Sequence, residues 1–152
     1  MPVLIYMGLV AEVFGVYAER GILGFSPVVV LRAEDGRILP IYIGISEAVA
    51  IHSALKNEIP PRPMTHDLLV EIIRRLDAKV VKVIIDDMID NIFYARLILK
   101  KNGQEVEIDA RPSDSIAIAV RLAVPIYIDE KVLDEAYKDE LPETFVDFDE
   151  VI

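Results

Sequence analysis

The order of strand-like and helix-like segments is the feature that most limits what this chain can fold into. β-rich segments come first, two helical segments follow, and a second run of strands precedes a further helix. A doubly wound parallel sheet requires strands and helices in strict alternation, which this order does not provide. The sequence therefore predicts a single compact α+β domain, with largely antiparallel sheets and three to four helices packed against them.

The strands are marked by β-branched and aromatic residues between turn signals. Val3 to Tyr17 is β-rich and is broken only by Gly8 and Gly15. Turns at 34–36 and 102–103 predict two tight hairpins, because acidic or amide residues followed by glycine favour such turns. The remaining predicted strands are Ser26–Ala33, Ile38–Ile43, Lys79–Ile85, Ile92–Lys100, Glu105–Ala110 and Pro125–Ile128.

Caps and prolines set the expected helix boundaries. Ser46 is a suitable N-cap for a helix through Leu55, and the prolines at 60–63 would close that unit with a stiff connection. A second helix is predicted to begin at Thr65, with an apolar stripe that would lie on a sheet: Leu68, Leu69, Ile72, Ile73 and Leu76. Two later helices are predicted, a deeply packed one at Ser113–Leu122 and a shorter one at Glu130–Tyr137.

Composition limits the class of protein. A chain of 152 residues with 53% hydrophobic side chains can build one core without disulfides, and it contains no cysteine. The mean hydropathy of +0.39 is high for a small domain, so we expect a homo-oligomer, a dimer or larger. No leader pattern or long apolar run is present, which predicts a cytoplasmic protein without membrane contact. The scarcity of Asn and Gln is typical of a thermophile.

Acidic residues are concentrated at the C-terminal end. The net charge is −10, and residues 129–152 hold ten acidic side chains against two lysines. We therefore divide the chain into a domain at 1–137 and an acidic C-terminal tail at 138–152. The tail could be solvated, or it could cover a basic site as a mimic of nucleic acid. Its apolar residues favour partial docking: Leu141, Phe145, Val146, Phe148, Val151 and Ile152.

Two local clusters share one plan, in which Arg and Pro precede a hydroxyl residue and an aspartate at a helix start. The first runs from Arg62 to Asp67 and the second from Arg111 to Asp114. Thr65 or Ser113 could accept from free backbone amides, and helix starts favour anions, so each cluster is a candidate phosphate pocket. The arginines would supply bidentate contacts to the phosphate.

Structural roles compete with these assignments. Asp67 and Asp114 could form salt bridges with Arg62 and Arg111 rather than belong to an anion pocket. Glu47, in the first turn of the preceding helix, could simply complement the helix dipole. His66 could be a packed, hydrogen-bonded histidine rather than a base.

Four segments together resemble the bifunctional nuclease domain family. They are Leu39–Gly44 with Glu47 and Ala48, Pro61–Leu69, Phe93–Leu97 and Ile108–Ala117, and the resemblance runs from Leu4 to Leu133. It implies cleavage of both RNA and DNA, with single-stranded nucleic acid as the expected partner. The motif positions it offers as candidate site residues are Glu47, Arg62, His66, Asp67, Asp109, Arg111 and Asp114.

Two mechanisms could use these residues. In the first, Asp67 and Asp114, with or without Glu47, hold a magnesium or manganese ion that activates water, and Arg62 and Arg111 clamp the phosphate. In the second, His66 is the base and a carboxylate orients it. We prefer the metal route, because DNA has no 2′-hydroxyl nucleophile and water must be activated. Both Arg-Pro clusters and Asp109 are expected to share one cleft.

A non-catalytic protein is the competing class. In that interpretation the Arg-Pro clusters hold a small anion or a carboxylate of a partner, and the protein is regulatory. The sequence shows no patch of interleaved aromatic and basic residues, which proteins that hold long single strands usually have. A third interpretation treats the polar clusters as contacts between subunits.

Overall fold

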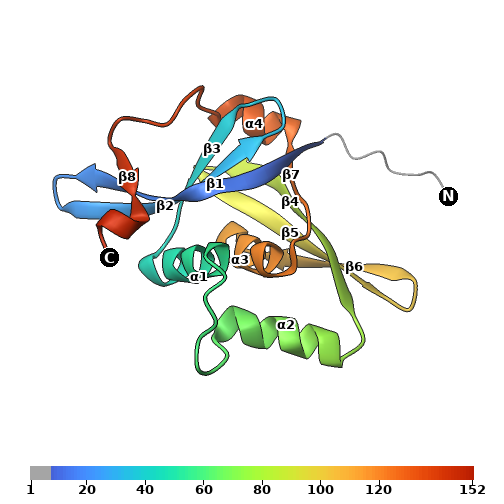
Figure 1. Ribbon diagram of the computed structural model, residues 1–152. Coiled ribbons are helices and arrows are strands. Elements are labelled where there is room, and N and C mark those ends of the chain that lie inside the picture. The colour runs from blue at the N-terminus through green and yellow to red at the C-terminus, as the bar shows by residue number, and fades with distance from the viewer. Residues whose placement is uncertain (1–7) are drawn as a thin grey trace.

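The computed structural model describes residues 8–152, which form one open sheet with helices packed mainly on one face (Figure 1). The strands are β1 (Gly8–Gly21), β2 (Gly24–Ala33), β3 (Ile38–Tyr42), β4 (Lys79–Ile89), β5 (Ile92–Lys101), β6 (Gln104–Ala110), β7 (Ile126–Asp129) and β8 (Phe145–Asp147). The helices are α1 (Ile45–Leu55), α2 (Thr65–Arg75), α3 (Pro112–Leu122), α4 (Glu130–Ala136) and the 3-10 turn η1 (Phe148–Glu150).

The strand order is β3-β2-β1-β7-β4-β5-β6, and β8 adds to β1. Every pairing among these strands is antiparallel except that of β4 with β7. The predicted α+β class is confirmed, and so are the two hairpins at 34–36 and 102–103. The part of the first predicted strand at 3–7 lies outside the described residues.

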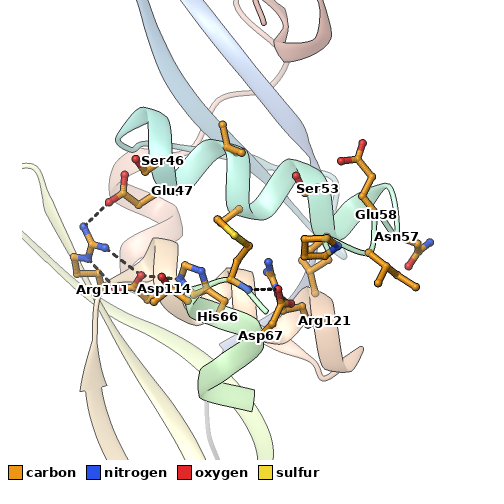
Figure 2. A pocket seen from close by; sticks show the side chains of 18 residues that line it. Ser46, Glu47, Ser53, Asn57, Glu58, His66, Asp67, Arg111, Asp114 and Arg121 are labelled. Atoms are coloured by element: carbon orange, nitrogen blue, oxygen red, sulfur yellow. Dashed lines mark hydrogen bonds and ion pairs between the residues drawn. The ribbon is translucent and has the colours of Figure 1, made fainter. Parts of the chain in front are cut away.

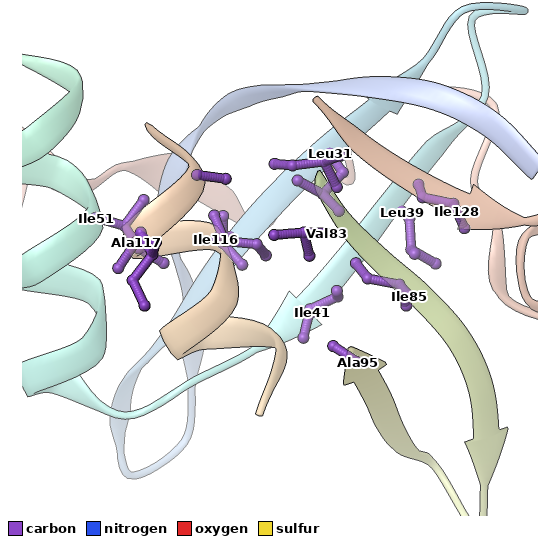
Figure 3. Close-up of a cluster of buried hydrophobic side chains, with 14 of the residues drawn as sticks. Leu31, Leu39, Ile41, Ile51, Val83, Ile85, Ala95, Ile116, Ala117 and Ile128 are labelled. Atoms are coloured by element: carbon purple, nitrogen blue, oxygen red, sulfur yellow. The ribbon is translucent and has the colours of Figure 1, made fainter. Parts of the chain in front are cut away.

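The core lies between the sheet and α3. Ile116 and Ala117 of α3 are fully buried; Ile116 faces Val83 and Leu31 of the sheet, and Ala117 lies beside Ile51 of α1 (Figure 3). Helix α1 packs beside α3, where Ala48 and Ile51 are also fully buried. Burial on nearly all sides explains why the sequence of α3 is apolar almost all round. Because α3 is fixed in this way, the residues at its N-terminus have a rigid support.

Helix α2 does not lie on the sheet as predicted. It packs on α3, which separates most of it from the strands (Figure 1). Val70 and Ile73 contact the core, whereas Leu68, Leu69, Ile72 and Leu76 are 39–60% exposed. An apolar stripe shows which face of a helix avoids water, but not which element covers it. Association with a second copy stays a prediction.

The C-terminal segment, residues 138–152, is folded against the domain. Lys138 pairs with Ile38 of β3, and β8 then pairs with β1. Phe148 is fully buried and packs edge-on against His52 of α1, with ring centroids 5.2 Å apart. The interpretation of this segment as a freely solvated tail is therefore wrong. No helix within residues 8–152 is long and apolar enough to cross a bilayer.

Candidate functional site

The first turns of α1, α2 and α3 converge on a pocket of about 860 Å³ (Figure 2). Glu47, Asp67 and Asp114 each occupy the third position of their own helix. A carboxylate in the first turn is stabilised by the positive end of the helix dipole, which explains why acidic residues recur at this position. The pocket therefore collects three carboxylates whose backbones are fixed by packed helices.

Glu47, His66, Arg111 and Asp114 form one connected group, the ion-paired cluster. Arg111 donates from Nε and Nη2 to the two oxygens of Asp114, at 2.8 and 3.1 Å, and from Nη1 to Glu47 Oε1 at 3.1 Å. His66 Nε2 lies 2.9 Å from Asp114 Oδ1. Gly44 leaves space for the Glu47 carboxylate, because a Cβ at that position would overlap it. Three segments distant in sequence thus meet in direct hydrogen bonds.

Asp114 is held ionised in this cluster. Burial raises the pKa of its carboxyl, but the hydrogen bonds from Arg111 and His66 outweigh that effect, so the pKa lies below the ordinary 3.8. Hydrogen bonds to Asp114 and to Glu47 raise the pKa of Arg111, and the bond to Asp114 is the largest cause. The cluster therefore presents an anionic carboxylate bound to both a guanidinium and an imidazole.

Asp67 forms a second ion pair within the same pocket. Its Oδ1 accepts from Arg121 Nε at 2.8 Å, and its Oδ2 accepts from the backbone amide of Met64 at 3.0 Å. The proposed pairing of Asp67 with Arg62 is therefore wrong, whereas that of Asp114 with Arg111 is present. Sequence reasoning missed Arg121. Its position seven residues after Asp114 in one helix placed both on the same face, and that spacing could have revealed it.

The structure brings together six of the nine candidate residues. Glu47, Thr65, His66, Asp67, Arg111 and Asp114 all line the pocket. Arg62 is exposed in the loop before α2 and does not line it. Asp109 is exposed on β6 opposite Arg96, and Ser113 is buried rather than open to the pocket.

The absence of these three from the pocket has local causes. Ser113 is rotated by about 100° from Asp114 around the helix, which turns its hydroxyl into the protein. No N-cap side chain caps α1, α2 or α3 by a hydrogen bond, so the predicted hydroxyl caps at Ser46, Thr65 and Ser113 are wrong. Gly44, Met64 and Arg111 are the N-cap residues instead. Asp109 lies before the turn into α3, on the edge strand.

The expected magnesium or manganese ligands do not fit a metal site in this arrangement. Both oxygens of Asp114 and both of Asp67 already accept hydrogen bonds, and four of these five bonds come from arginine or histidine groups. Among residues 8–152, no group of three or more His, Asp or Glu side chains converges as a metal site. A divalent cation would have to displace these cations. The metal ion stays a prediction from the sequence.

The C-terminal segment does not cover the pocket. Its contacts with α1 are made by Asp149, which lies 2.7 Å from His52 Nε2 and also pairs with Lys56. Ser46, Glu47, Ser53 and Asn57 of the same region line the pocket, and none of the residues at 138–152 does. The segment therefore contacts α1 through residues that do not line the pocket.

Asp67→Asn is expected to lower the free energy of unfolding at neutral pH by about 1.5–3 kcal/mol, the usual contribution of a hydrogen bond to a charged group. The hydrogen bond from Arg121 holds the pKa of Asp67 below the ordinary 3.8. The carboxylate therefore stabilises the fold above about pH 4, and this contribution disappears as the pH falls through the folded-state value. Urea unfolding of both proteins should show their difference closing in acid.

Glu71→Gln is the matched control for this change. Glu71 lies one turn further along α2 and pairs only with the exposed Arg74 and Arg75. Exposed pairs of this kind contribute little, so the control should unfold like the wild type at every pH. An Asp67→Asn protein as stable as the wild type at neutral pH would show that the Arg121 pair does not support the pocket.

Comparison with known proteins identifies the family to which this chain is similar. The model of the bifunctional nuclease domain matches residues 29–140. An uncharacterized protein of Mycobacterium tuberculosis is 47% identical over 112 residues, which are 73% of this chain and 66% of that protein. Bifunctional nuclease 1 of Oryza sativa subsp. japonica is 36% identical over 68% of this chain and 33% of its own length. Bifunctional nuclease 1 of Arabidopsis thaliana is 32% identical over 74% and 35%.

The matched region contains the elements that build the pocket. It runs from β2 through α4 and includes the first turns of α1, α2 and α3. The chain spans about two thirds of the mycobacterial relative and about one third of the plant relatives. The family model covers most of residues 1–152, and several relatives exceed 30% identity. This chain belongs to the bifunctional nuclease domain family.

Proposed function

We propose that this chain hydrolyses phosphodiester bonds of RNA and DNA at the ion-paired cluster. The observation that carries the proposal is that Asp114 binds His66 and Arg111 at once, at the wall of a pocket. A base and a phosphate ligand held by one carboxylate are the two groups that hydrolysis of a phosphodiester needs. The plant relatives are named bifunctional nucleases, which supports the same class of reaction.

His66 is the proposed general base. When its Nε2 donates to Asp114, the other ring nitrogen, Nδ1, is left without a proton and can accept one from water. Asp114 fixes the imidazole orientation and stabilises the imidazolium that forms. Activated water can attack RNA and DNA alike, because the reaction does not use the 2′-hydroxyl. His66 is largely buried, so its position is set by packing as well as by Asp114.

Arg111 is the proposed phosphate ligand. Its side chain is 61% exposed although it makes three hydrogen bonds. A guanidinium carries five N–H groups, so two remain for phosphate oxygens without release of Asp114. This arrangement would let Arg111 bind the scissile phosphate and stabilise the charge that develops on it. The second arginine of the expected clamp, Arg62, does not line the pocket, and Arg121 is occupied by Asp67.

The charge of the pocket favours the competing class, a non-catalytic binding protein. The lining contains four carboxylates, from Glu47, Glu58, Asp67 and Asp114, against two guanidinium groups, from Arg111 and Arg121. An excess of negative charge repels a polyanion at long range. A regulatory protein that binds a small ligand here would show saturable binding without any turnover, which separates it from a hydrolase.

The proposal is tested with fluorogenic single-stranded RNA and DNA oligonucleotides. Wild-type protein should cleave both, and Asp114→Asn should lower the rate by roughly 100-fold or more, because it releases both His66 and Arg111. Asp109→Asn is the matched control, since it removes an exposed carboxylate outside the pocket and should leave the rate unchanged. Equal rates for wild type and Asp114→Asn would overturn the proposal.

Dialysis against a chelator separates the two chemical routes. The His66 route predicts that the chelated wild-type protein keeps its activity on DNA. Loss of activity that magnesium or manganese restores would contradict the His66 route and would favour the ion expected at Asp67 and Asp114. Either result would leave the assignment of the pocket as the hydrolytic site intact.

A further inference from the structure

The pocket extends well beyond the ion-paired cluster. Its other end is formed by the last turn of α1 and the loop toward α2, where Ser53, Asn57 and Glu58 line it (Figure 2). In this view Arg111 and Glu47 lie at one end, and Asn57 and Glu58 lie at the opposite end. A volume of about 860 Å³ is within the usual range for pockets that enclose an organic ligand, about 300–1,000 Å³. A single phosphate would leave most of this space empty.

The polar groups at this far end differ from those of the cluster in their partners. Within the described chain, no hydrogen bond or ion pair occupies the side chains of Ser53, Asn57 or Glu58. Lys56, the nearest cation in sequence, forms its ion pair with Asp149 and attracts Glu58 only electrostatically. The polar groups of the ion-paired cluster hydrogen-bond to one another. At the far end a hydroxyl, an amide and a carboxylate remain available to a ligand.

Apolar side chains flank these free groups. Ile59 is 93% exposed, Met64 is 60% exposed and Val49 is 44% exposed, and all three line the pocket together with Pro60. Apolar surface around a few polar groups is typical of a pocket that takes a small organic ligand. Three of the four residues at 60–63 are prolines, whose fixed φ angles limit the conformations that this bent loop can adopt.

We infer that the far end of the pocket is a nucleobase subsite that takes guanine, with the attached phosphate directed toward Arg111. The inference rests on the proposed function, since the phosphate contact is that of the hydrolytic site. A base extruded from a single strand is normally held by apolar contacts on its faces and by hydrogen bonds to its edge. The apolar wall and the free polar groups provide both.

Guanine is selected by the carboxylate of Glu58. The Watson–Crick edge of guanine presents two adjacent N–H donors, and an ionised carboxylate is an acceptor with two oxygens. Adenine, cytosine and uracil lack two adjacent donor groups on that edge, so the second carboxylate oxygen would face an acceptor instead of an N–H. A negative group at this end also explains part of the acidic excess of the pocket, because it faces the base rather than the phosphate.

Asn57 has a structural role that must be separated from base binding. Its φ of +55° is in the left-handed region, and it follows Lys56, the C-cap residue of α1. Asparagine and glycine adopt this conformation most readily, so the residue also terminates the helix. Asn57→Gly removes the amide and keeps the turn, whereas alanine at this position would strain the backbone.

The test is calorimetric titration of the intact protein with the four ribonucleoside 5′-monophosphates, which contain no phosphodiester bond to cleave. Guanosine monophosphate should bind at least 10-fold more tightly than the other three. Glu58→Gln should remove most of that preference, because the amide places a donor against one guanine N–H. Glu105→Gln, an exposed change on β6, is the charge-matched control and should retain it.

A second titration distinguishes a free nucleotide from a nucleotide within a strand. Phosphorothioate octathymidylate with one central guanine should bind more tightly than octathymidylate alone, and Glu58→Gln should abolish the difference. Equal affinity for all four monophosphates, or a guanine preference that survives Glu58→Gln, would overturn the subsite. Cleavage without base preference would overturn the subsite alone, whereas guanine binding without any cleavage would overturn the hydrolase alone.

Discussion

Replacing Phe148 with alanine is expected to lower the free energy of unfolding by about 3–5 kcal/mol, the usual loss for a buried phenylalanine. Phe148 is fully buried within the main core although it lies only four residues from the C-terminus. Its ring also contacts His52, which supports α1. Alanine would leave a cavity that α1 and β1 cannot close, because both are fixed by other contacts. Urea unfolding at neutral pH measures the effect.

Ile152→Ala provides the control in the same segment. This side chain is 66% exposed, so the change should leave the unfolding midpoint close to that of the wild type. If Phe148→Ala unfolds within about 1 kcal/mol of the wild type, the ring does not belong to the core. Truncation from Asp139 onward removes Phe148 as well. It should therefore destabilise the domain.

His66→Ala is expected to lower kcat for cleavage by about 10²–10⁴-fold, the usual contribution of general acid–base catalysis. The KM should change little, because Arg111 and Asp114 remain paired through two hydrogen bonds without the imidazole. A loss confined to kcat identifies a group that acts in the transition state. Steady-state kinetics on a fluorogenic DNA oligonucleotide measure both constants.

The second histidine supplies the matched control. His52 also pairs with an aspartate, Asp149, but it contacts the C-terminal segment and does not line the pocket. His52→Gln should therefore leave kcat within a few-fold of the wild type. Equal losses in the two variants would mean that the effect comes from weakened packing of α1 or α2, and His66 would then not be the base.

Much of the fold could be predicted because its signals are local. Turn residues at 34–36 and 102–103 fixed two hairpins, and the start of α2 at Thr65 was predicted at its observed position. The covering partner of α2 could not be predicted, because an apolar stripe packs equally well on a helix or a sheet. The extension of β4 to Ile89 also depends on a partner, since β5 pairs along its full length.

The candidate site was predictable where a helix start determined it. Glu47, Asp67 and Asp114 occupy equivalent positions in three helices, so their motifs identified a common geometry. Arg62 and Asp109 belong to the same motifs but lie outside the helices. Their proximity in sequence to the helix starts did not show whether their side chains point toward the pocket. Arg121 was missed because its partner, Asp67, is distant in sequence and meets it only through the packing of α2 on α3.

The C-terminal segment shows the limit of a charge argument. Its acidic residues suggested a solvated tail or a cover for a basic site, yet it packs through Phe148 and pairs through β8. The acidic side chain of Asp149 contacts His52 and Lys56 rather than a substrate site. Net charge describes the field around a chain, whereas apolar side chains determine whether a segment docks.

We propose that one water-activating cluster hydrolyses both nucleic acids. Its most direct test compares cleavage of RNA and DNA oligonucleotides of identical sequence by wild-type and Asp114→Asn proteins, with analysis of the product ends. We expect cleavage of both polymers, linear RNA products without a 2′,3′-cyclic phosphate, and loss of both activities in Asp114→Asn. Cleavage of RNA alone with cyclic ends, or equal rates for the two proteins, would contradict it.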